Sequence, residues 1–401
     1  MIEEIHLVNW KSIKDSVLYI DPITALIGTN ASGKSNFLEA IITLSSLSKG
    51  RPVHEVIGNV RGGKDSIIRK GESLSSLSVK VKDETVSDVY YVYAVSFQES
   101  DGNVFIIKEN LDRVKKTAGG DSVKSLFSTM ELQSIESPTI DVRFFTGNKG
   151  RMRRLDLGRS TSILSQVDSL QINKDVKSAA SIVVGSLSNV FMLNPIPDNM
   201  RGYMPLSVTL NNDASNMAGV LSALDPERRK LVESKLTEFL KPLPEQDINR
   251  VWTERVGLFQ SDAMLYCEEQ WIPGQSTIVD ARTMSDGTLR FLAIVTAILT
   301  MRRGGLLIVE EIDNGLHPSR AKELVRVLKT LGNEQRVDIL FTTHNPVLVD
   351  QLGIEMLPFV FYIKRDPTTG ASVVLPLEEH NNLIKLMSSY SMGDLMVEDK
   401  L

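Results

Sequence analysis

The chain has 401 residues, of which 42% are hydrophobic and 24% charged, and its formal net charge is −5. These values are typical of a globular protein with two domains, or with one large α/β domain and an insertion. The acidic balance excludes attraction of nucleic acid by overall charge. The single cysteine excludes a disulfide within the chain and a cysteine-rich zinc site, and it is typical of a reducing compartment.

The start of the chain and its apolar segments indicate neither secretion nor membrane insertion. Residues 1–4 are acidic where a secretory signal needs positive charge. The longest apolar stretch, residues 291–301, is too short to cross a bilayer. We therefore expect a cytoplasmic protein that does not act in a membrane.

The first fifty residues predict strands followed by a helix. Residues 5–8, 17–20 and 23–27 are short apolar segments that predict strands, and the last of them ends at Gly28. Residues 35–47 carry apolar side chains near helical spacing. The order of strand, glycine-rich loop and helix is the context that a phosphate-binding loop requires.

The middle of the chain changes from strand to helix patterning. Residues 76–110 alternate between apolar and polar side chains and predict an antiparallel meander, and residues 116–124 predict an exposed loop. From residue 160 to 255 helical patterning dominates, interrupted by prolines and without the heptad run of a coiled coil.

The last third of the chain predicts alternating helices and strands. Residues 306–309 and 339–342 are buried strands between helices, and residues 379–401 predict a terminal helix. We therefore expect an α/β fold with three parts. Residues 1–155 form the first lobe with the meander, residues 156–260 a helical insertion, and residues 261–401 the second lobe.

Residues 28–35 match the phosphate-loop pattern G-x-x-x-x-G-K-[ST] in full. The glycines let the backbone curl so that N–H groups point at phosphate oxygens beside a helix N-terminus. Lys34 is expected to contact the β- and γ-phosphates of ATP, and the Ser35 hydroxyl to ligate Mg²⁺. The predicted ATP-binding residues of this segment are Gly28, Asn30, Ala31, Ser32, Gly33, Lys34, Ser35 and Asn36.

Two adjacent carboxylates follow the apolar strand at residues 306–309. Glu310 is placed to hold the Mg²⁺ shell and Glu311 to act as the general base for the attacking water. Such a pair is costly at the end of a buried strand unless a cation neutralises it. The alternative is a strand that simply leaves the core into a charged loop.

Two further motifs follow apolar strands or precede apolar helices. His344 comes directly after the strand at residues 339–342, where it could donate a hydrogen bond to the γ-phosphate. Ser285, Asp286 and Gly287 precede the apolar helix that begins near Phe291, and they predict a second anion-binding helix start. An ordinary N-cap at Ser285 or Asp286 is the alternative, and one site can do both jobs.

In this order, the phosphate loop, the Ser-Asp-Gly helix start, the acidic pair and the histidine resemble the ABC ATPase superfamily. Within it the chain resembles the RecF/SMC/OLD-like ATPases, with residues 7–14 similar to their N-F-[KR]-S leader. Leu316, His317 and Pro318 resemble the predicted AAA-type ATPases of bacterial phage-defence operons. The likeness extends to residues 392–395, near the end of the chain.

The resemblance implies a head-to-tail homodimer in which two subunits enclose each ATP. Lys34 of one subunit and Ser285, Asp286 and Gly287 of the other would contact the same nucleotide, and residues 314–317 would cross the interface. Gln166 is the candidate for the glutamine that senses Mg²⁺, with Gln98 as its rival. The resemblance leaves open whether these dimers assemble into a higher oligomer.

Two departures from the superfamily bear on function. Glu310 stands where Asp is usual, and we expect Mg²⁺ binding to survive the longer side chain. We expect neither a coiled-coil arm nor a nuclease domain in this sequence, so we expect a nuclease or toxin that acts with the predicted ATPase to be a separately encoded effector. The leading hypothesis is a sensor or scaffold ATPase of a phage-defence complex.

The alternative hypothesis is a RecF-like ATPase that binds DNA directly. The basic run at residues 149–154 favours it, although a run of this kind is also typical of a solvated loop. The sequence does not distinguish the two hypotheses.

Overall fold

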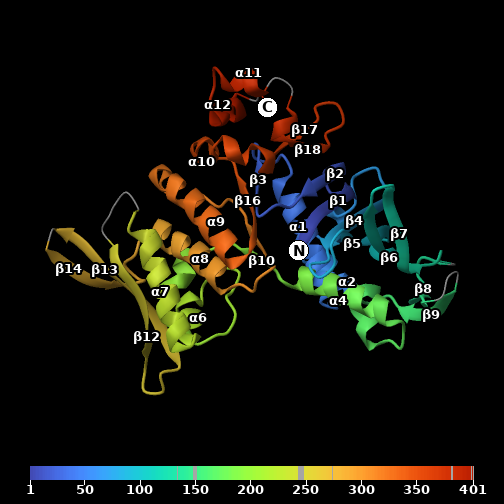
Figure 1. Cartoon of the computed structure of the whole chain (residues 1–401), viewed down its shortest axis with the longest axis horizontal. Coiled ribbons are helices and arrows are strands. Elements are labelled where there is room, and N and C mark those ends of the chain that lie inside the picture. Colours follow the sequence, from blue (N-terminus) through green and yellow to red (C-terminus); the bar gives the residue numbers. More distant parts are fainter. Residues whose placement is uncertain are drawn as a thin grey trace. The chain divides into compact units, whose positions relative to one another are not determined.

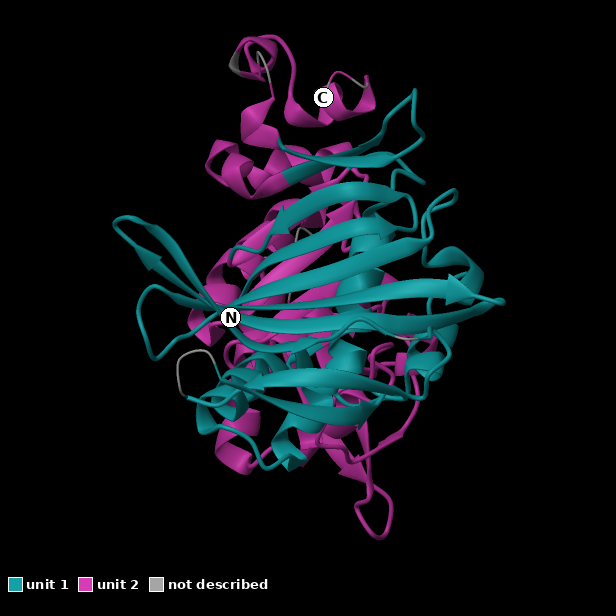
Figure 2. Ribbon diagram, turned by 90° about the vertical axis from the view of Figure 1, so that its right-hand side faces the viewer, with its two compact units in different colours: residues 1–21, 28–190, 361–376 teal, residues 22–27, 191–360, 377–401 magenta. Residues whose placement is uncertain are grey.

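The computed structural model describes residues 1–132, 134–147, 151–242, 248–272, 274–380, 383–398 and 400. They form two compact units, coloured separately in Figure 2. Unit 1 contains residues 1–21, 28–190 and 361–376, and unit 2 contains residues 22–27, 191–360 and 377–401. Each unit combines three separate stretches of chain, whereas the predicted lobes were contiguous in sequence.

Unit 1 is built on a largely antiparallel sheet (Figure 1). Its strands lie in the order β17-β18-β2-β1-β4-β5-β6-β7-β8-β9, and β18 meets β2 in parallel. The strands are β1 (Ile2–Trp10), β2 (Ile13–Tyr19), β4 (Leu74–Lys82), β5 (Val89–Ser100), β6 (Asn103–Thr117), β7 (Gly120–Thr129), β8 (Thr139–Phe145), β9 (Met152–Gly158), β17 (Val360–Arg365) and β18 (Ser372–Pro376). The predicted meander is confirmed.

The loop predicted at residues 116–124 is wrong. Thr117 pairs with Gly120, so β6 and β7 form a hairpin with a tight turn there. The strand ends on both sides are exposed to solvent, and they carry polar side chains that local composition cannot distinguish from a loop. Contacts between the paired strands stabilise the hairpin, and the local pattern of residues 116–124 does not show these contacts.

Helices α1 and α4 pack against the sheet of unit 1. Helix α1 contacts β1 and α4, and α4 contacts β4, β5 and β7. The apolar side chains of α1 that motivated the helix prediction, including Phe37 and Ile41, are fully buried. The helices of this unit are α1 (Lys34–Ser48), α2 (Val53–Gly58), α3 (Ile163–Gln166) and α4 (Lys174–Ser188), with 3-10 turns at Lys64–Ser66 and Val167–Ser169.

A carboxyl group lies inside the core of unit 1. Glu109 of β6 is 1% exposed. It accepts hydrogen bonds from the Tyr93 hydroxyl at 2.7 Å and from the Ile163 amide at 2.8 Å. Burial raises the pKa of Glu109 to about 7, and the hydrogen bonds from Ile163, Tyr93 and Leu164 oppose that rise. This group therefore couples the stability of unit 1 to pH.

Unit 2 contains a sheet with the strand order β10-β15-β16-β3, in which β15, β16 and β3 run parallel. Helix α9 contacts β16, β3 and the apolar helix α8. The strands are β3 (Ile23–Ile27), β10 (Val190–Leu193), β15 (Leu306–Val309) and β16 (Asp338–Thr343). The helices that follow them along the chain are α8 (Asp286–Thr300), α9 (Ala321–Gln335), α10 (Pro346–Leu352), α11 (Leu383–Met387) and α12 (Met392–Val397), with 3-10 turns at Pro318–Arg320, Ile354–Phe359 and Leu377–Glu379.

Unit 2 also holds a small antiparallel sheet that packs against two helices. Within the region of helical patterning predicted from residue 160 to 255, the structure has α6 (Met217–Ala223) and α7 (Pro226–Leu240). They are preceded by α5 (Pro197–Met200) and followed by β12 (Ile248–Val256), β13 (Asp262–Ile272) and β14 (Gln275–Asp280), and β11 (Met204–Pro205) pairs with β13. The end of the helical region predicted up to residue 255 is therefore a strand.

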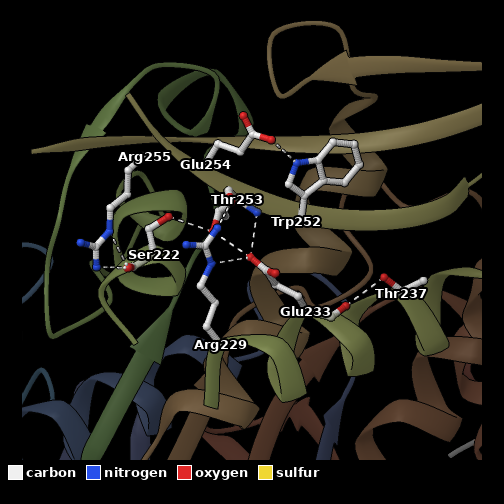
Figure 3. Close-up of polar contacts among 8 residues, drawn as sticks. All are labelled: Ser222, Arg229, Glu233, Thr237, Trp252, Thr253, Glu254 and Arg255. Atoms are coloured by element: carbon white, nitrogen blue, oxygen red, sulfur yellow. Dashed lines mark hydrogen bonds and ion pairs between the residues drawn. The ribbon is translucent and has the colours of Figure 1, made fainter. Parts of the chain in front are cut away.

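A buried polar network joins α7 to β12 (Figure 3). Glu233 accepts hydrogen bonds from the Thr253 amide at 2.8 Å, the Thr253 hydroxyl at 2.9 Å and Arg229 Nε at 2.9 Å. Ser222 of α6 donates to the Thr253 hydroxyl at 2.8 Å. These bonds fix the helices on the sheet and satisfy the buried Thr253 hydroxyl. Across the described part of the chain, no helix combines the length and the apolar character needed to span a bilayer.

Candidate functional site

The phosphate loop of unit 1 has the strained backbone that its glycines permit. Gly28 has φ 147° and Gly33 has φ 116°, and Ala31 has φ 62°. A side chain at Gly28 would place its Cβ 2.3 Å from the Ile363 carbonyl oxygen, and one at Gly33 would place it 2.2 Å from the Ser372 hydroxyl. Only glycine fits these two positions, because both the torsion and the space exclude a Cβ.

Lys34 lies in the concavity of this loop. Its side chain is largely buried, with 7% of the residue exposed. The ammonium donates to the carbonyl oxygens of Gly28 at 2.7 Å and Thr29 at 2.8 Å. The positive charge is therefore held at the loop itself, next to the N-terminus of α1, where it can meet phosphate oxygens.

Residues from the two ends of the sequence support the loop. Ser372 of β18 donates to the carbonyl of Ser32, and its hydroxyl lies 2.6 Å from the Ser12 hydroxyl. Asn36 donates to the same Ser12 hydroxyl at 2.6 Å, and the Trp10 indole donates to the Asn36 carbonyl at 2.9 Å. The loop is thus fixed from β1, the β1–β2 turn and β18.

The loop has the polar groups that a phosphate needs. Among the described residues, the buried Ser32 hydroxyl has no hydrogen-bond partner. Buried polar groups normally have partners, so an unpaired one in a phosphate loop fits a bound anion. The outer residues Thr29, Asn30 and Ala31 are exposed, which leaves the cradle accessible. The residues present fit a nucleoside polyphosphate.

In unit 2 two loops leave the same edge of the parallel strands. Val309 pairs with Phe341, and β3 pairs with β16 up to Ile27 and Thr343. Glu310 therefore follows β15 and His344 follows β16, both at the carboxyl ends of parallel strands. This edge is where ligands bind in open α/β sheets.

Glu311 and His344 lie beside each other. His344 Nδ1 is 3.6 Å from Glu311 Oε1, and their side chains are 45% and 41% exposed. Glu311 has φ 48°, a left-handed conformation that a residue with a long side chain rarely adopts. Its amide donates to the Thr342 hydroxyl at 2.8 Å, which holds this backbone in place. Glu310 is half-buried at the end of β15.

Thr343, the residue of β16 after Thr342, contacts both the loop that carries Glu311 and the loop that carries His344. Its hydroxyl donates to Asp313 Oδ1 at 2.6 Å and accepts a hydrogen bond from the Asn345 amide at 3.0 Å. The paired threonines therefore tie the loop of Glu311 to the loop of His344. The sequence alone indicates no role for them, because a threonine at the end of a strand is not part of a recognisable motif.

Ser285 caps α8, which agrees with the predicted N-cap. Its hydroxyl accepts a hydrogen bond from the Thr288 amide at 3.1 Å. Ser285 and Asp286 are exposed, so they can also meet a ligand. Arg201 donates to the Met284 carbonyl at 2.7 Å and forms an ion pair with Asp286. Arg201 lies far away in the sequence, and no motif indicated this contact.

Gly287 lies close to the loop at residues 314–317. A Cβ at this position would lie 3.0 Å from the Gly315 carbonyl oxygen and 3.2 Å from an Arg320 guanidinium nitrogen. The buried Arg320 also reaches the Thr288 hydroxyl at 3.3 Å. The helix start and the loop predicted to contact a second subunit are therefore adjacent in one unit.

The prediction of Gln166 as a metal ligand is wrong. Its neighbour Ser162 donates to the Leu47 carbonyl, at the C-terminal end of α1, and the Gln166 amide donates back to Gly158 at 2.8 Å. Ser35 is in the first turn of α1, and a helix of 15 residues is about 20 Å long. Gln166 cannot share a metal ion with Ser35 across that length.

Gln98 stays a prediction. It pairs with Leu74 at the end of the meander, where β1 runs toward Trp10. The Trp10 indole in turn donates to the Asn36 carbonyl in the first turn of α1. Gln98 is therefore at the end of this sheet that leads to the phosphate loop.

Two family models match the chain. Residues 1–145 match an AAA ATPase domain. Residues 195–350 match a model described as AAA domain, putative AbiEii toxin, Type IV TA system. Each covers less than half of the chain, and together they cover both the phosphate loop and the acidic pair.

A curated relative and two solved structures are similar to the chain. The DNA replication and repair protein RecF of Acaryochloris marina (strain MBIC 11017) is 33% identical over 85 residues, 21% of this chain and 20% of that protein. The SMC head domain with an extended coiled coil, bound to the C-terminal domain of ScpA and derived from Pyrococcus furiosus, has a TM-score of 0.52 at 14% identity, over 97% of this chain and 99% of that one. The SMC head bound to the C-terminal winged-helix domain of ScpA has a TM-score of 0.50 at 14% identity, over 93% and 96%.

At this identity the solved structures show the fold alone, which is that of an SMC head. The RecF match covers only a fifth of that protein's length, so it carries no activity over. The family models add the ATPase class. The chain is therefore similar to ATPase family models over two separate stretches and to SMC heads in its fold, and an ABC-class ATPase of the RecF/SMC/OLD-like group is the proposal that these matches support.

Proposed function

We propose that the chain binds ATP with Mg²⁺ and hydrolyses it as a homodimer. The observation that carries the proposal is that the chain contains both a prearranged phosphate loop and an exposed Glu311–His344 pair. Lys34 and the loop glycines provide for phosphate binding. Glu311 and His344 follow neighbouring parallel strands at their carboxyl ends, and they provide for water activation.

In the proposed reaction, Glu311 accepts a proton from the water that attacks the γ-phosphate. His344 donates a hydrogen bond to the γ-phosphate, and Lys34 stabilises the charge that develops on its oxygens. The hydroxyl of Ser35 and the carboxylate of Glu310 are the oxygen ligands that would hold Mg²⁺, which neutralises charge on the β- and γ-phosphates.

The exposed helix start at Ser285 supports a dimer. Ser285 and Asp286 face solvent, and Gly287 packs on the loop at residues 314–317. We propose that this surface contacts the nucleotide held by the phosphate loop of a second copy. ATP then closes the dimer and hydrolysis reopens it, which makes the reaction a switch.

Mixing two inactive variants tests the shared site. Lys34→Ala removes the loop cation, and Ser285→Arg blocks the helix start. Each variant alone should be inactive, whereas an equal mixture should recover up to about a quarter of the wild-type rate, since half of the dimers are mixed and each has one intact site. A mixture as inactive as its components, while wild-type protein hydrolyses ATP, would contradict the dimer.

We further propose a role as sensor or scaffold of an anti-phage defence complex with a separately encoded nuclease or toxin. The resemblance of residues 316–318 to defence ATPases and the match to the AbiEii-type family model support it. Affinity purification of the chain from its host should recover an adjacent gene product in stoichiometric amount. Recovery of the chain alone, with unchanged phage sensitivity after deletion, would contradict the role.

A second candidate is a RecF-like ATPase that binds DNA. Arg153 and Arg154 are exposed on β9, which favours it, although Arg154 is already paired with Asp141. Arg151 of the same run is also exposed, and residues 149 and 150 lie outside the described residues. Filter binding at two salt concentrations decides: tight retention that falls steeply with salt supports DNA binding, and weak, salt-independent retention contradicts it.

A further inference from the structure

The C-terminal helix α12 is fixed to the helix that follows His344. Ser391 caps α12 in a capping box: its hydroxyl accepts a hydrogen bond from the Asp394 amide, and the Asp394 carboxylate accepts one from the Ser391 amide. Gly393 and Leu395 of this helix are buried. The motif at residues 391–395 is thus an ordered start of a helix that packs on α10.

Two contacts join this motif to α10. Asp350 accepts hydrogen bonds from the Gly393 amide at 2.7 Å and from the Ser391 hydroxyl at 3.1 Å. A Cβ at Gly393 would lie 2.5 Å from the Pro346 carbonyl oxygen and 2.8 Å from its Cβ. The torsion at Gly393 does not require glycine, so close approach to Pro346 explains the residue.

Pro346 is two residues from His344. Asn345 caps α10 with its side chain, and its amide donates to the Thr343 hydroxyl. The His344 backbone is therefore held from one side by β16 and from the other by the first turn of α10. The opposite end of α10 is held separately, because Lys329 donates to the Leu352 carbonyl at 3.1 Å.

We infer that residues 391–395 are a positioning element for His344. Gly393 and Asp350 act through Pro346, and they set where the imidazole lies relative to Glu311. The inference rests on the proposed ATPase function, in which His344 contacts the γ-phosphate. A displacement on the order of 1 Å at a catalytic group is enough to cost about 100-fold in rate.

Gly393→Ala tests the inference, with Val397→Ala as the matched control on the same helix, since Val397 is 66% exposed. We expect kcat to fall about 10-fold or more in Gly393→Ala with the Kd for ATP unchanged, and no change in the control. In a His344→Ala background, Gly393→Ala should lower kcat no further, because both changes act through the same group.

An equal kcat in Gly393→Ala and wild type, a parallel loss of ATP affinity, or an undiminished effect in the His344→Ala background would each overturn the inference. If Gly393→Ala does not fold, Asp350→Ala replaces it, and Asp350→Asn, which keeps one acceptor oxygen, should restore activity.

Hydrogen exchange separates this inference from the ATPase proposal. Exchange of the peptide that contains His344 should rise in Gly393→Ala and not in Val397→Ala, whether or not the wild type hydrolyses ATP. Unchanged exchange would overturn the positioning role, whereas raised exchange in a wild-type protein without turnover would contradict only the proposed function.

Discussion

The phosphate loop and the Glu311–His344 pair differ in how far the chain completes their contacts. Lys34 is largely buried on two carbonyls of its own loop, which β1 and β18 support from behind. The side chains of Glu311 and His344 are 41% and 45% exposed and lie 3.6 Å apart, and the Glu311 amide is held by Thr342. A prearranged loop reduces the ordering cost of binding, whereas exposed side chains at the proposed catalytic pair are available to a ligand or a second subunit.

This comparison predicts the largest loss of activity for Glu311→Gln. The amide keeps the shape of the side chain but cannot take a proton from water, so ATP hydrolysis should fall about 1000-fold. ATP affinity should be unchanged, because the phosphate loop is intact. Turnover and equilibrium binding measured on the same preparation check this, and equal turnover in variant and wild type would remove Glu311 as the base.

Lys34→Ala should act on the other region and weaken ATP binding about 100-fold, since charge-assisted hydrogen bonds to phosphate are lost. Titration calorimetry with ATP measures the change. Lys14→Ala, an exposed lysine on β2, is the control and should bind as the wild type does. An affinity retained in Lys34→Ala would break the proposed division of roles between the two regions.

Thr342→Val should have an intermediate effect. Valine keeps the volume at the buried position 342 but removes the acceptor for the Glu311 amide, which is left unpaired in a partly buried position. We expect kcat to fall about tenfold with KM unchanged, because the base is misplaced and the loop is not. Thr342→Ser should restore the rate; if serine is as slow as valine, the hydroxyl does not position Glu311.

Of these variants, Glu109→Gln should change ATP hydrolysis least and the pH dependence of the free energy of unfolding most. The pKa of Glu109 is about 7 in the folded protein against a reference of 4.5, so the folded state binds the proton more tightly. Its stabilising contribution is complete below pH 4.5 and is lost as the pH rises through 7, by about 3 kcal/mol at most. Urea unfolding at pH 5 and pH 8 should show this slope in wild type and in the exposed control Glu99→Gln, and a smaller one in Glu109→Gln.

Local patterns in the sequence predicted the phosphate loop, α1, the meander and the two apolar strands. In each case the signal lies within a dozen residues: glycines at fixed spacing, or apolar residues that alternate or recur every turn. The hairpin of β6 and β7 was not predicted, because its exposed ends carry polar residues like those of a loop. The hairpin forms because the two strands pair, and the sequence of one strand alone does not indicate this pairing.

Contacts between distant parts of the sequence could not be predicted in this way. Ser372 donates a hydrogen bond to Ser32, which lies 340 residues away in the sequence, and neither segment carries a pattern that indicates this contact. The error at Gln166 has the same origin, because the resemblance implied a glutamine near the metal, whereas Gln166 follows β9 and lies near the C-terminal end of α1. The order of strands in space decides such cases, and it depends on the whole sheet.

Strand β9 is the last in the strand order of unit 1, and its arginines have a consequence for handling the protein. A free sheet edge can recruit a strand from another molecule, and charged side chains discourage this. Replacing Arg153 or Arg154 by apolar residues to probe DNA binding would therefore risk self-association of the sample. Glutamine, with light scattering recorded at each salt concentration, is the safer substitution.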